Sequence, residues 1–286
     1  MARPVGGKQV AGPPLLAEWE GRSVEAWGRR LRAETVEFHE TVSSTNHRAR
    51  VLIGEGMPVP AVVVAERQSA GRGRRGRGWV SDTPHGLWFT VVWEVGEGSV
   101  DALPLRVGLG VAGGVESVVP ELRMEVKWPN DLVVHGRKLG GVLCERSGDH
   151  VVVGIGLNLN HEGGDFPAGL EASAISIRLA TGRIVSRARV LGRVMDALAG
   201  LRACAHSEVP ASELAELQAR SPLSGCSLWI DGIVRHSSEH PRAVDGMPVT
   251  AGAVLADGSL EVRDDAGRTL RFIAGTIRRQ TTTPGS

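Results

Sequence analysis

An arginine- and glycine-rich segment, residues 65–79, is the part of this sequence whose residue types point most directly to chemistry. It reads Ala-Glu-Arg-Gln-Ser-Ala-Gly-Arg-Gly-Arg-Arg-Gly-Arg-Gly-Trp, with no carboxylate between Glu66 and Asp82. Such a segment has little apolar surface to bury and its charges repel one another, so it becomes ordered around an anion such as a phosphate or carboxylate. The glycines let the backbone approach that anion closely. This segment, named here the arginine loop, therefore predicts an anionic ligand.

A second segment, Lys127-Trp128-Pro129-Asn130-Asp131, places a carboxamide and a carboxylate at a break in a strand. Pro129 forces the preceding residue to be extended and cannot donate to a sheet, so the chain must change course there. Asn130 and Asp131 can then orient a ligand or a metal, although Asp131 can equally cap a turn. Trp128 is expected to be a core residue.

Two further segments add a rare lysine and a set of glycines. Only three of the 33 basic residues are lysines, and one of them, Lys138, precedes Gly140-Gly141 at the start of a predicted strand. A lysine entering a buried sheet is costly unless an anion awaits it, and the paired glycines leave room for a flat group. Residues 154–160, Gly-Ile-Gly-Leu-Asn-Leu-Asn, suit a nucleotide ribose or base.

Hydrophobic periodicity and turn residues predict the elements that must position these segments. His135-Gly136 is expected to form a tight turn that brings Lys138 opposite the strand starting at Asn130-Asp131. Expected strands cover 36–42, 61–65, 86–95, 125–128, 131–134, 139–145 and 150–157. Expected helices cover 24–32, from Ser43 or Ser44 to 53, 103–119, 187–205 and 212–220.

The chain is predicted to be an α+β protein in which a mixed sheet with helices is followed by a small β-barrel. Residues 1–35 are expected to be a weakly structured extension, residues 36–220 the ligand-binding domain, and residues 222–280 the barrel, with a boundary at Ser221-Pro222. The strands of the barrel are expected to be separated by Asp231-Gly232, Asp245-Gly246, Asp257-Gly258 and Asp264–Gly267.

Composition excludes several classes of protein. A net charge of +1 argues against coating nucleic acid by bulk electrostatics. Three widely spaced cysteines, Cys144, Cys204 and Cys226, indicate neither a disulfide framework nor a CxxC metal site. No apolar run is long enough for a membrane span, so a cytoplasmic protein is expected. Gly71–Gly76 matches GxGxxG formally, but a polar stretch broken by Pro84 follows instead of a helix, so a Rossmann site is rejected.

Taken together and in this order, the segments resemble the bacterial biotin–protein ligase family over roughly residues 36–280. The matching motifs are Ser44-Thr45-Asn46, Gln68, the Gly-Arg-Gly-Arg-Arg-Gly-Arg loop, Lys-Trp-Pro-Asn-Asp, Arg-Lys-Leu-Gly-Gly and Gly-x-Gly-x-Asn. The resemblance implies a catalytic domain related to class II aminoacyl-tRNA synthetases and an SH3-like barrel. It implies that biotin and ATP, with Mg²⁺, give biotinyl-5′-AMP and pyrophosphate. The biotinyl group then passes to a lysine of a biotin carboxyl carrier domain.

The resemblance also implies roles for individual residues. Arg74, Lys138 and Asp131 are expected to be catalytic, with Arg74 and Lys138 stabilising phosphoryl charge and Asp131 orienting or deprotonating the incoming amine. No metal ligand is assigned. The biotin-binding set is Ser44, Thr45, Asn46, Gln68, Gly71, Arg72, Gly73, Arg74, Lys138 and Gly141. The ATP-binding set is Arg75, Arg77, Trp79, Asn130 and Asn158.

The sequence departs from the family's pattern in two places. Only about 35 residues precede Val36, too few for a helix-turn-helix domain with its own core, so a ligase without repressor function and without nucleic acid as a partner is expected. His236–Arg242 reads as an insertion in the barrel, so no family roles are assigned there. The expected assembly is a monomer or homodimer.

Three alternatives stay open at this point. A lipoate or octanoyl ligase would use the same fold and adenylate chemistry, although the arginine loop and Lys-Trp-Pro-Asn-Asp favour biotin. A nucleic-acid-binding regulator could place the arginine loop on phosphates, but the near-neutral charge and the lack of a recognition helix count against it. A non-catalytic biotin-binding module is disfavoured because both Lys138 and Asp131 are present.

Overall fold

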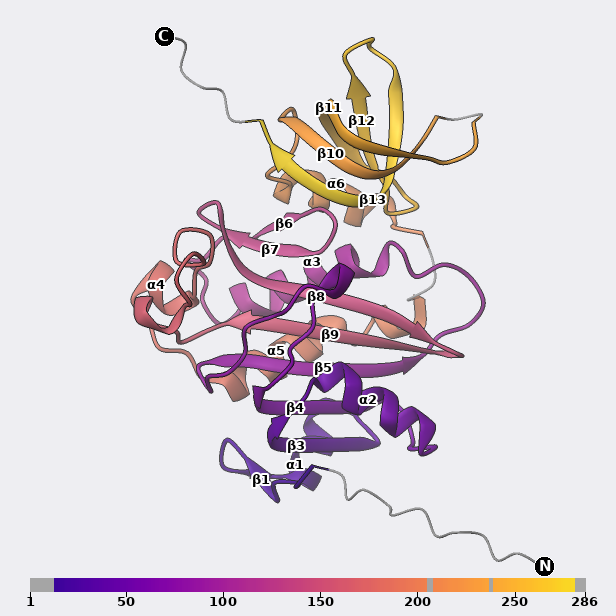
Figure 1. Cartoon of the computed structure of the whole chain (residues 1–286). Helices are drawn as coiled ribbons and strands as arrows, with labels where there is room; N and C mark the ends of the chain where they lie inside the picture. The colour runs from indigo at the N-terminus through magenta and orange to yellow at the C-terminus, as the bar shows by residue number, and fades with distance from the viewer. Residues whose placement is uncertain (1–12, 205–207, 237–238, 281–286) are drawn as a thin grey trace, which may run out of the picture.

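The computed structural model describes residues 13–204, 208–236 and 239–280. A seven-stranded mixed sheet with helices is followed by a closed barrel of four strands (Figure 1), which confirms the expected α+β class. The sheet order is β3-β4-β5-β9-β8-β7-β6, with β3 and β4 parallel and the other neighbours antiparallel. The strands of the sheet are β3 (Thr35–Val42), β4 (Ala61–Gln68), β5 (Gly86–Glu94), β6 (Glu125–Lys127), β7 (Asp131–Val134), β8 (Arg137–Ser147) and β9 (His150–Asn158).

The two faces of the sheet are covered unequally. One face carries α1, α3 and α5 and the main hydrophobic core, whereas α2 alone packs on the other face, over β4, β5 and β9. The apolar cluster beneath α2 is small and includes Ala49, Leu52 and Val63. Beyond this cluster, α2 does not cover the parts of β8 and β9 that line the pocket described below. The helices are α1 (Val24–Leu31), α2 (Thr45–Gly54), α3 (Leu103–Glu116), α4 (Ile177–Thr181), α5 (Arg187–Leu198) and α6 (Ala211–Arg220).

Residues 13–35 form a packed part of the protein, and the expectation that they are weakly structured was wrong. A two-stranded hairpin, β1 (Glu18–Trp19) and β2 (Arg22–Ser23), precedes α1. The rings of Trp19 and Phe38 stack with centroids 5.3 Å apart, and Trp27 packs beside both. The Gly/Pro-rich composition hid these tryptophans, which together bury a large apolar surface. Residues 1–12 of the predicted extension lie outside the described residues.

Two predicted helices end earlier than expected. The helix expected over 187–205 stops at Leu198, followed by a short 3-10 turn, η3 (Leu201–Cys204); its last predicted residue, Ala205, lies outside the described residues. Gly200 follows Ala199, the C-cap residue, and glycine commonly terminates helices. The helix expected over 103–119 ends at Glu116. Neither change moves a predicted site residue.

Two of the Asp-Gly pairs that were expected to separate strands of the barrel, Asp231-Gly232 and Asp245-Gly246, lie inside strands, so this expectation was wrong. The strands of the barrel are β10 (Ser227–Arg235), β11 (Arg242–Val254), β12 (Leu260–Asp264) and β13 (Thr269–Arg279). Asp231-Gly232 marks a β-bulge in β10, and the Asp231 carboxylate accepts a hydrogen bond at 2.7 Å from the backbone N–H of Gly246 on β11. A bulge and a turn both favour Asp and Gly, so sequence alone did not separate them. The predicted insertion at His236–Arg242 includes residues 237–238, which lie outside the described residues.

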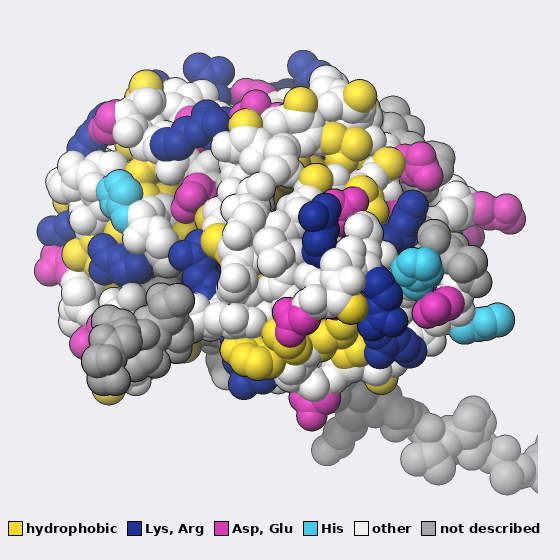
Figure 2. All heavy atoms as spheres, turned by 90° about the horizontal axis from the view of Figure 1, so that it is seen from above, with side chains coloured by type: hydrophobic (Ala, Val, Ile, Leu, Met, Phe, Trp, Pro, Cys, Tyr) yellow, Lys and Arg dark blue, Asp and Glu magenta, His cyan; other side chains and the backbone are white. Residues whose placement is uncertain are grey.

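Trp128 joins the sheet to the barrel. Its indole Nε1 donates to the carbonyl of Gly258 at 2.9 Å, and its ring lies 4.9 Å from that of Phe272. The predicted core role of Trp128 is confirmed, because the side chain is buried. Seen from the barrel side, Lys and Arg side chains are interspersed with Asp and Glu (Figure 2). No described helix is long and apolar enough to span a membrane.

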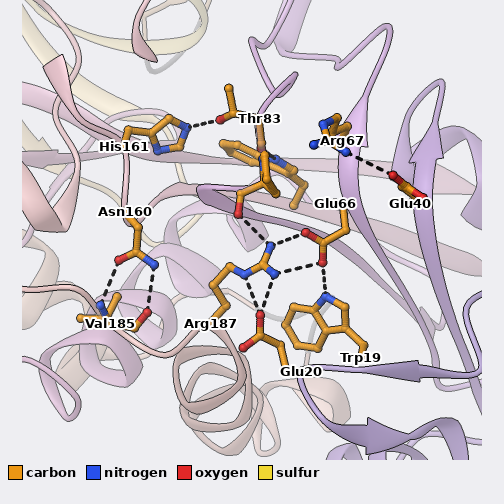
Figure 3. A network of polar contacts seen from close by, with 12 residues as sticks. Trp19, Glu20, Glu40, Glu66, Arg67, Thr83, Asn160, His161, Val185 and Arg187 are labelled. Atoms are coloured by element: carbon orange, nitrogen blue, oxygen red, sulfur yellow. Dashed lines mark hydrogen bonds and ion pairs between the residues drawn. The ribbon is translucent and has the colours of Figure 1, made fainter. Parts of the chain in front are cut away.

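A partly buried ionic network lies at the end of β4, the strand that leads into the arginine loop (Figure 3). Arg187, at the start of α5, donates to Glu66 at 2.7 Å and to Glu20 at 2.6 Å. Trp19 Nε1 donates to the other oxygen of Glu66 at 2.6 Å, and the Arg187 guanidinium lies over the Trp19 ring. One arginine thus connects three parts of the chain that are distant in sequence.

Replacing Arg187 by methionine is expected to lower the free energy of unfolding by about 2 kcal/mol, because it leaves two partly buried carboxylates without their charged hydrogen-bond donor. The matched control is Arg183→Met, which removes the exposed pair with Glu121, and its expected cost is below about 0.5 kcal/mol. Urea unfolding of the two variants checks this difference. Equal losses of stability would contradict it.

Candidate active site

Most of the predicted site residues meet at one pocket on the α2 face, with a volume of about 210 Å³. Its walls come from the start of α2, the arginine loop, the turn between β6 and β7, strands β8 and β9, and β13 of the barrel. The predicted residues that line it are Ser44, Thr45, Asn46, Gln68, Arg72, Gly73, Arg74, Arg75, Arg77, Trp79, Asn130, Asp131, Lys138 and Gly141.

Two glycines of β9 form the floor of the pocket. A Cβ atom on Gly154 would lie 2.1 Å from the Asn46 Oδ1, and one on Gly156 would lie 2.8 Å from the Trp79 Nε1. Neither distance is sterically possible, so these positions need glycine for the two side chains to lie flat on the sheet. The Gly-x-Gly pattern in the sequence therefore marks the contact of Asn46 and Trp79 with the sheet.

Polar side chains at one end of the pocket form a continuous hydrogen-bonded row. The backbone N–H of Thr45 donates to the Gln68 Oε1 at 2.9 Å, and the Gln68 Nε2 donates to Ser81 at 3.0 Å. The hydroxyl oxygens of Thr45 and Thr90 lie 2.8 Å apart, and Thr90 Oγ1 lies 2.7 Å from the Asn46 Oδ1. These groups are buried, so a ligand here would meet hydrogen-bonding partners of fixed position.

The arginine loop adopts a tight hairpin. Arg72 and Gly78 form a β-bridge, and the Gly73 N–H donates to the Arg77 carbonyl at 2.8 Å. Arg75 has a φ of 56°, in the left-handed region, and its guanidinium donates to the Thr276 hydroxyl of β13 at 2.8 Å. The barrel therefore contacts the loop directly, which the sequence did not predict.

Arg74 points from the loop toward the turn between β6 and β7. Its Nη1 donates to the Asn130 Oδ1 at 3.4 Å, and the Asn130 amide in turn donates to the carbonyl of Val142 at 2.7 Å. Burial, together with the neighbouring charge of Arg75, lowers the pKa of Arg74 from its ordinary value. The guanidinium remains charged, because its ordinary pKa is far above neutral pH.

Lys138 and Asp131 form an ion pair of 2.6 Å across the β7–β8 hairpin, in which Lys138 is paired with Val133 and Asp131 with Gly141. The Lys138 ammonium also lies 5.1 Å from the centre of the Trp79 ring, within the range of a cation–π interaction. Both charged side chains are only partly exposed. An ammonium, a carboxylate and an aromatic face are thus presented side by side.

Two predicted site residues do not line the pocket. Gly71 lies at the base of the arginine loop, where its carbonyl accepts a hydrogen bond from the Trp79 N–H at 2.9 Å. Asn158 lies on β9, but its amide donates to the carbonyl of Ile175 at 3.2 Å. The pattern identified the strand correctly but could not show the direction of this side chain.

Other residues that belong to the site were assigned no role there from the sequence. Lys127 and Thr276 line the pocket, and Glu145 of β8 lies behind it against Asn46 and Arg72. The scarcity of lysine was a signal for Lys127. Nothing local distinguishes Glu145 or Thr276, because their relevance arises from long-range packing.

His161 follows β9 and is buried at the edge of the site. Its Nε2 lies 3.2 Å from the Thr83 hydroxyl, and its ring contacts Trp88 and stacks on Phe166. Burial lowers the pKa of His161 from 6.5 to about 4, and Asp165 offsets this effect only in part. The imidazole is therefore neutral in the folded protein near neutral pH.

This histidine is expected to make the protein less stable in mild acid. Between pH 6.5 and 4 the unfolded state binds a proton at residue 161 that the folded state does not, so the free energy of unfolding falls as pH drops, by up to about 3 kcal/mol. His161→Leu should reduce this slope, whereas His47→Gln, at an exposed position on α2, should not. Urea unfolding at several pH values measures it, and identical slopes in both variants would refute the assignment.

Residues 38–158 match the model of the Biotin/lipoate A/B protein ligase family. This range contains α2, the arginine loop and strands β6 to β9, which build most of the pocket. Residues 38–158 are thus similar to that family, a class of ligases for biotin and lipoate.

Within this class, several relatives are named as biotin ligases. The "Bifunctional ligase/repressor BirA" of Bacillus subtilis is 31% identical over 200 residues, which cover 66% of this chain and 60% of that protein. The biotin–[acetyl-CoA-carboxylase] ligase of Mycobacterium tuberculosis is 38% identical over 122 residues, 41% of this chain and 46% of that protein. The chain is thus matched to only 60% of the length of the Bacillus relative.

The fold is that of solved biotin protein ligases. The ligase from Aquifex aeolicus in complex with biotin and ATP aligns with a TM-score of 0.68 and 24% identity. The alignment covers 86% of this chain and 100% of the Aquifex chain. Both the sheet and the C-terminal barrel thus follow the architecture that the family resemblance predicted.

Proposed function

We propose that this protein is an ATP-dependent biotin–protein ligase. The observation that carries the proposal is a single pocket in which a buried row of amide and hydroxyl groups, including Thr45 and Gln68, lies beside the cations Arg74 and Lys138. A ligand with a polar ring at one end and a carboxylate at the other, such as biotin, matches this arrangement. The names of two relatives, both biotin–[acetyl-CoA-carboxylase] ligases, support the same substrate.

In the first step, an oxygen of the biotin carboxylate attacks the α-phosphorus of ATP. The bond from that phosphorus to the bridging oxygen breaks, and pyrophosphate leaves with the electron pair. Two anions approach one another and further charge develops on the phosphoryl oxygens, so fixed cations lower the barrier. Lys138 and Arg74 are the proposed source of that charge, because both line the pocket from partly buried positions.

In the second step, a carrier lysine attacks the acyl carbon of biotinyl-5′-AMP. The bond from the acyl carbon to the phosphate oxygen breaks, AMP leaves, and the amine loses a proton. Asp131 is the one carboxylate among the described residues that line the pocket, so we assign it the role of orienting the amine and accepting this proton. The Lys138 ammonium lies 2.6 Å from the Asp131 carboxylate and so holds it at the pocket.

The pocket offers no preformed cage for Mg²⁺. Among residues 13–204, 208–236 and 239–280, no group of three or more His, Cys, Asp and Glu side chains is placed to hold a metal ion. Protein-bound Mg²⁺ commonly relies on one or two carboxylates and on substrate phosphates. A role for Mg²⁺ together with ATP therefore stays a prediction.

The direct test is pyrophosphate release with ATP and either biotin or lipoate, followed by transfer to a biotin carboxyl carrier domain detected with streptavidin. A carrier whose acceptor lysine is replaced by arginine is the control for the second step. Release with biotin and labelling of the intact carrier alone are expected. Release with lipoate and none with biotin would move the protein to the lipoate branch of the family.

The remaining partners and properties are also part of the proposal. The carrier domain of acetyl-CoA carboxylase or a related carboxylase is the expected acceptor, the cytoplasm the expected compartment, and a monomer or homodimer the expected assembly. We expect no repressor activity and no binding to nucleic acid. A mobility-shift experiment on the purified protein tests the binding to nucleic acid, and sedimentation measures the assembly.

A further inference from the structure

A β-bulge at the start of β8 turns the Lys138 side chain toward the pocket. Lys138 and Gly140 pair with consecutive residues of β7, which leaves Leu139 between them as the bulged residue. Alternate residues of a regular strand face the same side, so without the bulge Lys138 and Gly141 would face opposite sides. Instead, a Cβ atom on Gly141 would lie 3.5 Å from the Lys138 Cε, and Leu139 is buried in the hydrophobic core. The bulge therefore decides which face of the sheet receives the ammonium.

The backbone of Lys138 is fixed by residues 173–175, named here the flanking segment. The Lys138 N–H donates to the carbonyl of Ser173 at 2.7 Å, and the Lys138 carbonyl accepts from the Ile175 N–H at 3.0 Å. These two bonds form a parallel bridge between Lys138 and Ala174. Pairing between β8 and β9 stops short of Lys138, so the flanking segment takes the place of β9 beside the bulge.

Asn158, the last residue of β9, holds the flanking segment. Its Nδ2 donates to the carbonyl of Ile175 at 3.2 Å, and both residues are buried. A buried backbone carbonyl requires a donor, and a carboxamide supplies one without adding a charge. Because the N–H of the same Ile175 donates to Lys138, the contact runs from Asn158 through a single residue to the lysine backbone.

Ser176 provides a second anchor, where the flanking segment enters α4. Its hydroxyl donates to the carbonyl of His161 at 2.7 Å and accepts from the N–H of Leu179 at 3.0 Å, as the N-cap of the helix. The side chain of Ser176 is completely buried. Asn158 and Ser176 therefore fix the segment that holds Lys138, although neither side chain lines the pocket itself.

We infer that Asn158 is a positioning residue for Lys138, acting through Ile175 of the flanking segment. The inference rests on the proposed function, in which Lys138 stabilises the charge that develops on the phosphoryl group. An ammonium does so only from a fixed position, and a displacement of about 1 Å can slow a reaction by up to about a hundredfold. This role differs from the ATP-binding role that the family resemblance implied for Asn158.

The test compares Asn158→Ala with Asn160→Ala in pyrophosphate release. The Asn160 carboxamide also holds a backbone, that of Val185, with hydrogen bonds of 3.0 and 2.9 Å, and is the matched control (Figure 3). Asn158→Ala should lower kcat about ten- to a hundredfold, with KM for ATP and for biotin changed less than about twofold. Asn160→Ala should keep kcat within about twofold of the wild type, although its melting temperature should fall by a similar amount.

A double-mutant cycle with Lys138→Met shows whether the effect passes through the lysine. In the Lys138→Met background, Asn158→Ala should slow the reaction further by less than about twofold. Ser176→Ala should reproduce the loss of kcat through the second anchor, and Ser176→Thr, which keeps the hydroxyl, should recover most of it. These two serine variants carry the test if Asn158→Ala does not fold.

The outcomes separate the inference from the proposed function. A wild-type protein that releases no pyrophosphate with biotin and ATP refutes the proposed function, and the inference falls with it. If the wild type is active, an unchanged kcat in Asn158→Ala or in Ser176→Ala refutes the inference alone. A raised KM for ATP at an unchanged kcat would instead assign Asn158 to the nucleotide site. A loss of kcat that persists in full without the Lys138 ammonium also overturns the inference, because Asn158 would then act by another route.

Discussion

Replacing Lys138 by methionine is expected to slow biotinyl-5′-AMP formation by two to three orders of magnitude while the protein remains folded. The ammonium is the compact cation that the β7–β8 hairpin holds at the pocket, 2.6 Å from Asp131 and over the face of Trp79. Losing one preorganised group that stabilises developing negative charge commonly costs about a hundred- to a thousandfold in rate. Methionine keeps the length and the apolar part of the side chain, so the charge is the main change.

Stability provides the internal control for this prediction. The Lys138–Asp131 pair is partly exposed, and pairs of this kind contribute at most about 1 kcal/mol to folding. Lys138→Arg, which keeps the charge but spreads it over a plane, should recover part of the rate. Pyrophosphate release under saturating ATP and biotin measures the rate. A methionine variant with a near-normal rate would remove Lys138 from the catalytic set.

The second large effect is expected for Arg74→Ala, which should release biotinyl-5′-AMP at least about tenfold faster and also slow its formation. Arg74 reaches from the loop to Asn130, so its guanidinium ties the loop to the turn between β6 and β7 across the pocket. A charge-assisted hydrogen bond to a bound phosphate is commonly worth about 1.5–3 kcal/mol, which corresponds to ten- to a hundredfold in dissociation. An exposed adenylate would also be hydrolysed by water.

Arg67 is the matched control, because it belongs to the same arginine-rich segment but pairs with Glu40 and does not line the pocket. Arg67→Ala should therefore retain the adenylate like the wild type. Retention can be followed by preforming labelled biotinyl-5′-AMP and measuring its loss on dilution. Equal dissociation from both variants would show that Arg74 does not hold the intermediate.

Contacts between residues that are close together in the sequence could be predicted, whereas contacts between distant segments could not. That Lys138 faces the strand beginning at Asp131 was predictable, because the two-residue turn at His135-Gly136 brings the two strands together within a few residues. Gly154 and Gly156 were recognised as a motif, yet their reason, room for Asn46 and Trp79, became clear only in three dimensions.

The features that the sequence did not predict, or predicted wrongly, have three different causes. Glu145 gains its place from packing β8 against α2, about a hundred residues earlier in the chain, and no local pattern carries that information. Asp231-Gly232 satisfied the chemistry of a turn but lies in a bulge, because the residues suit both. Trp19 and Trp27 were hidden in a Gly/Pro-rich stretch whose composition suggested little structure.

The contact between Arg75 and Thr276 has a consequence for how the chain could be divided. β13 supplies part of the pocket wall, and its Thr276 hydroxyl holds the arginine loop from outside. Trp128, which begins the turn that carries Asn130 and Asp131, is likewise held by Gly258 and Phe272 of the barrel. A fragment cut at Ser221-Pro222 would therefore keep every proposed catalytic side chain and still lack contacts that support the arginine loop and Trp128. The barrel thus completes one wall of the pocket, and a chimaera that takes its barrel from a homologue is expected to need matching residues at Arg75 and Trp128.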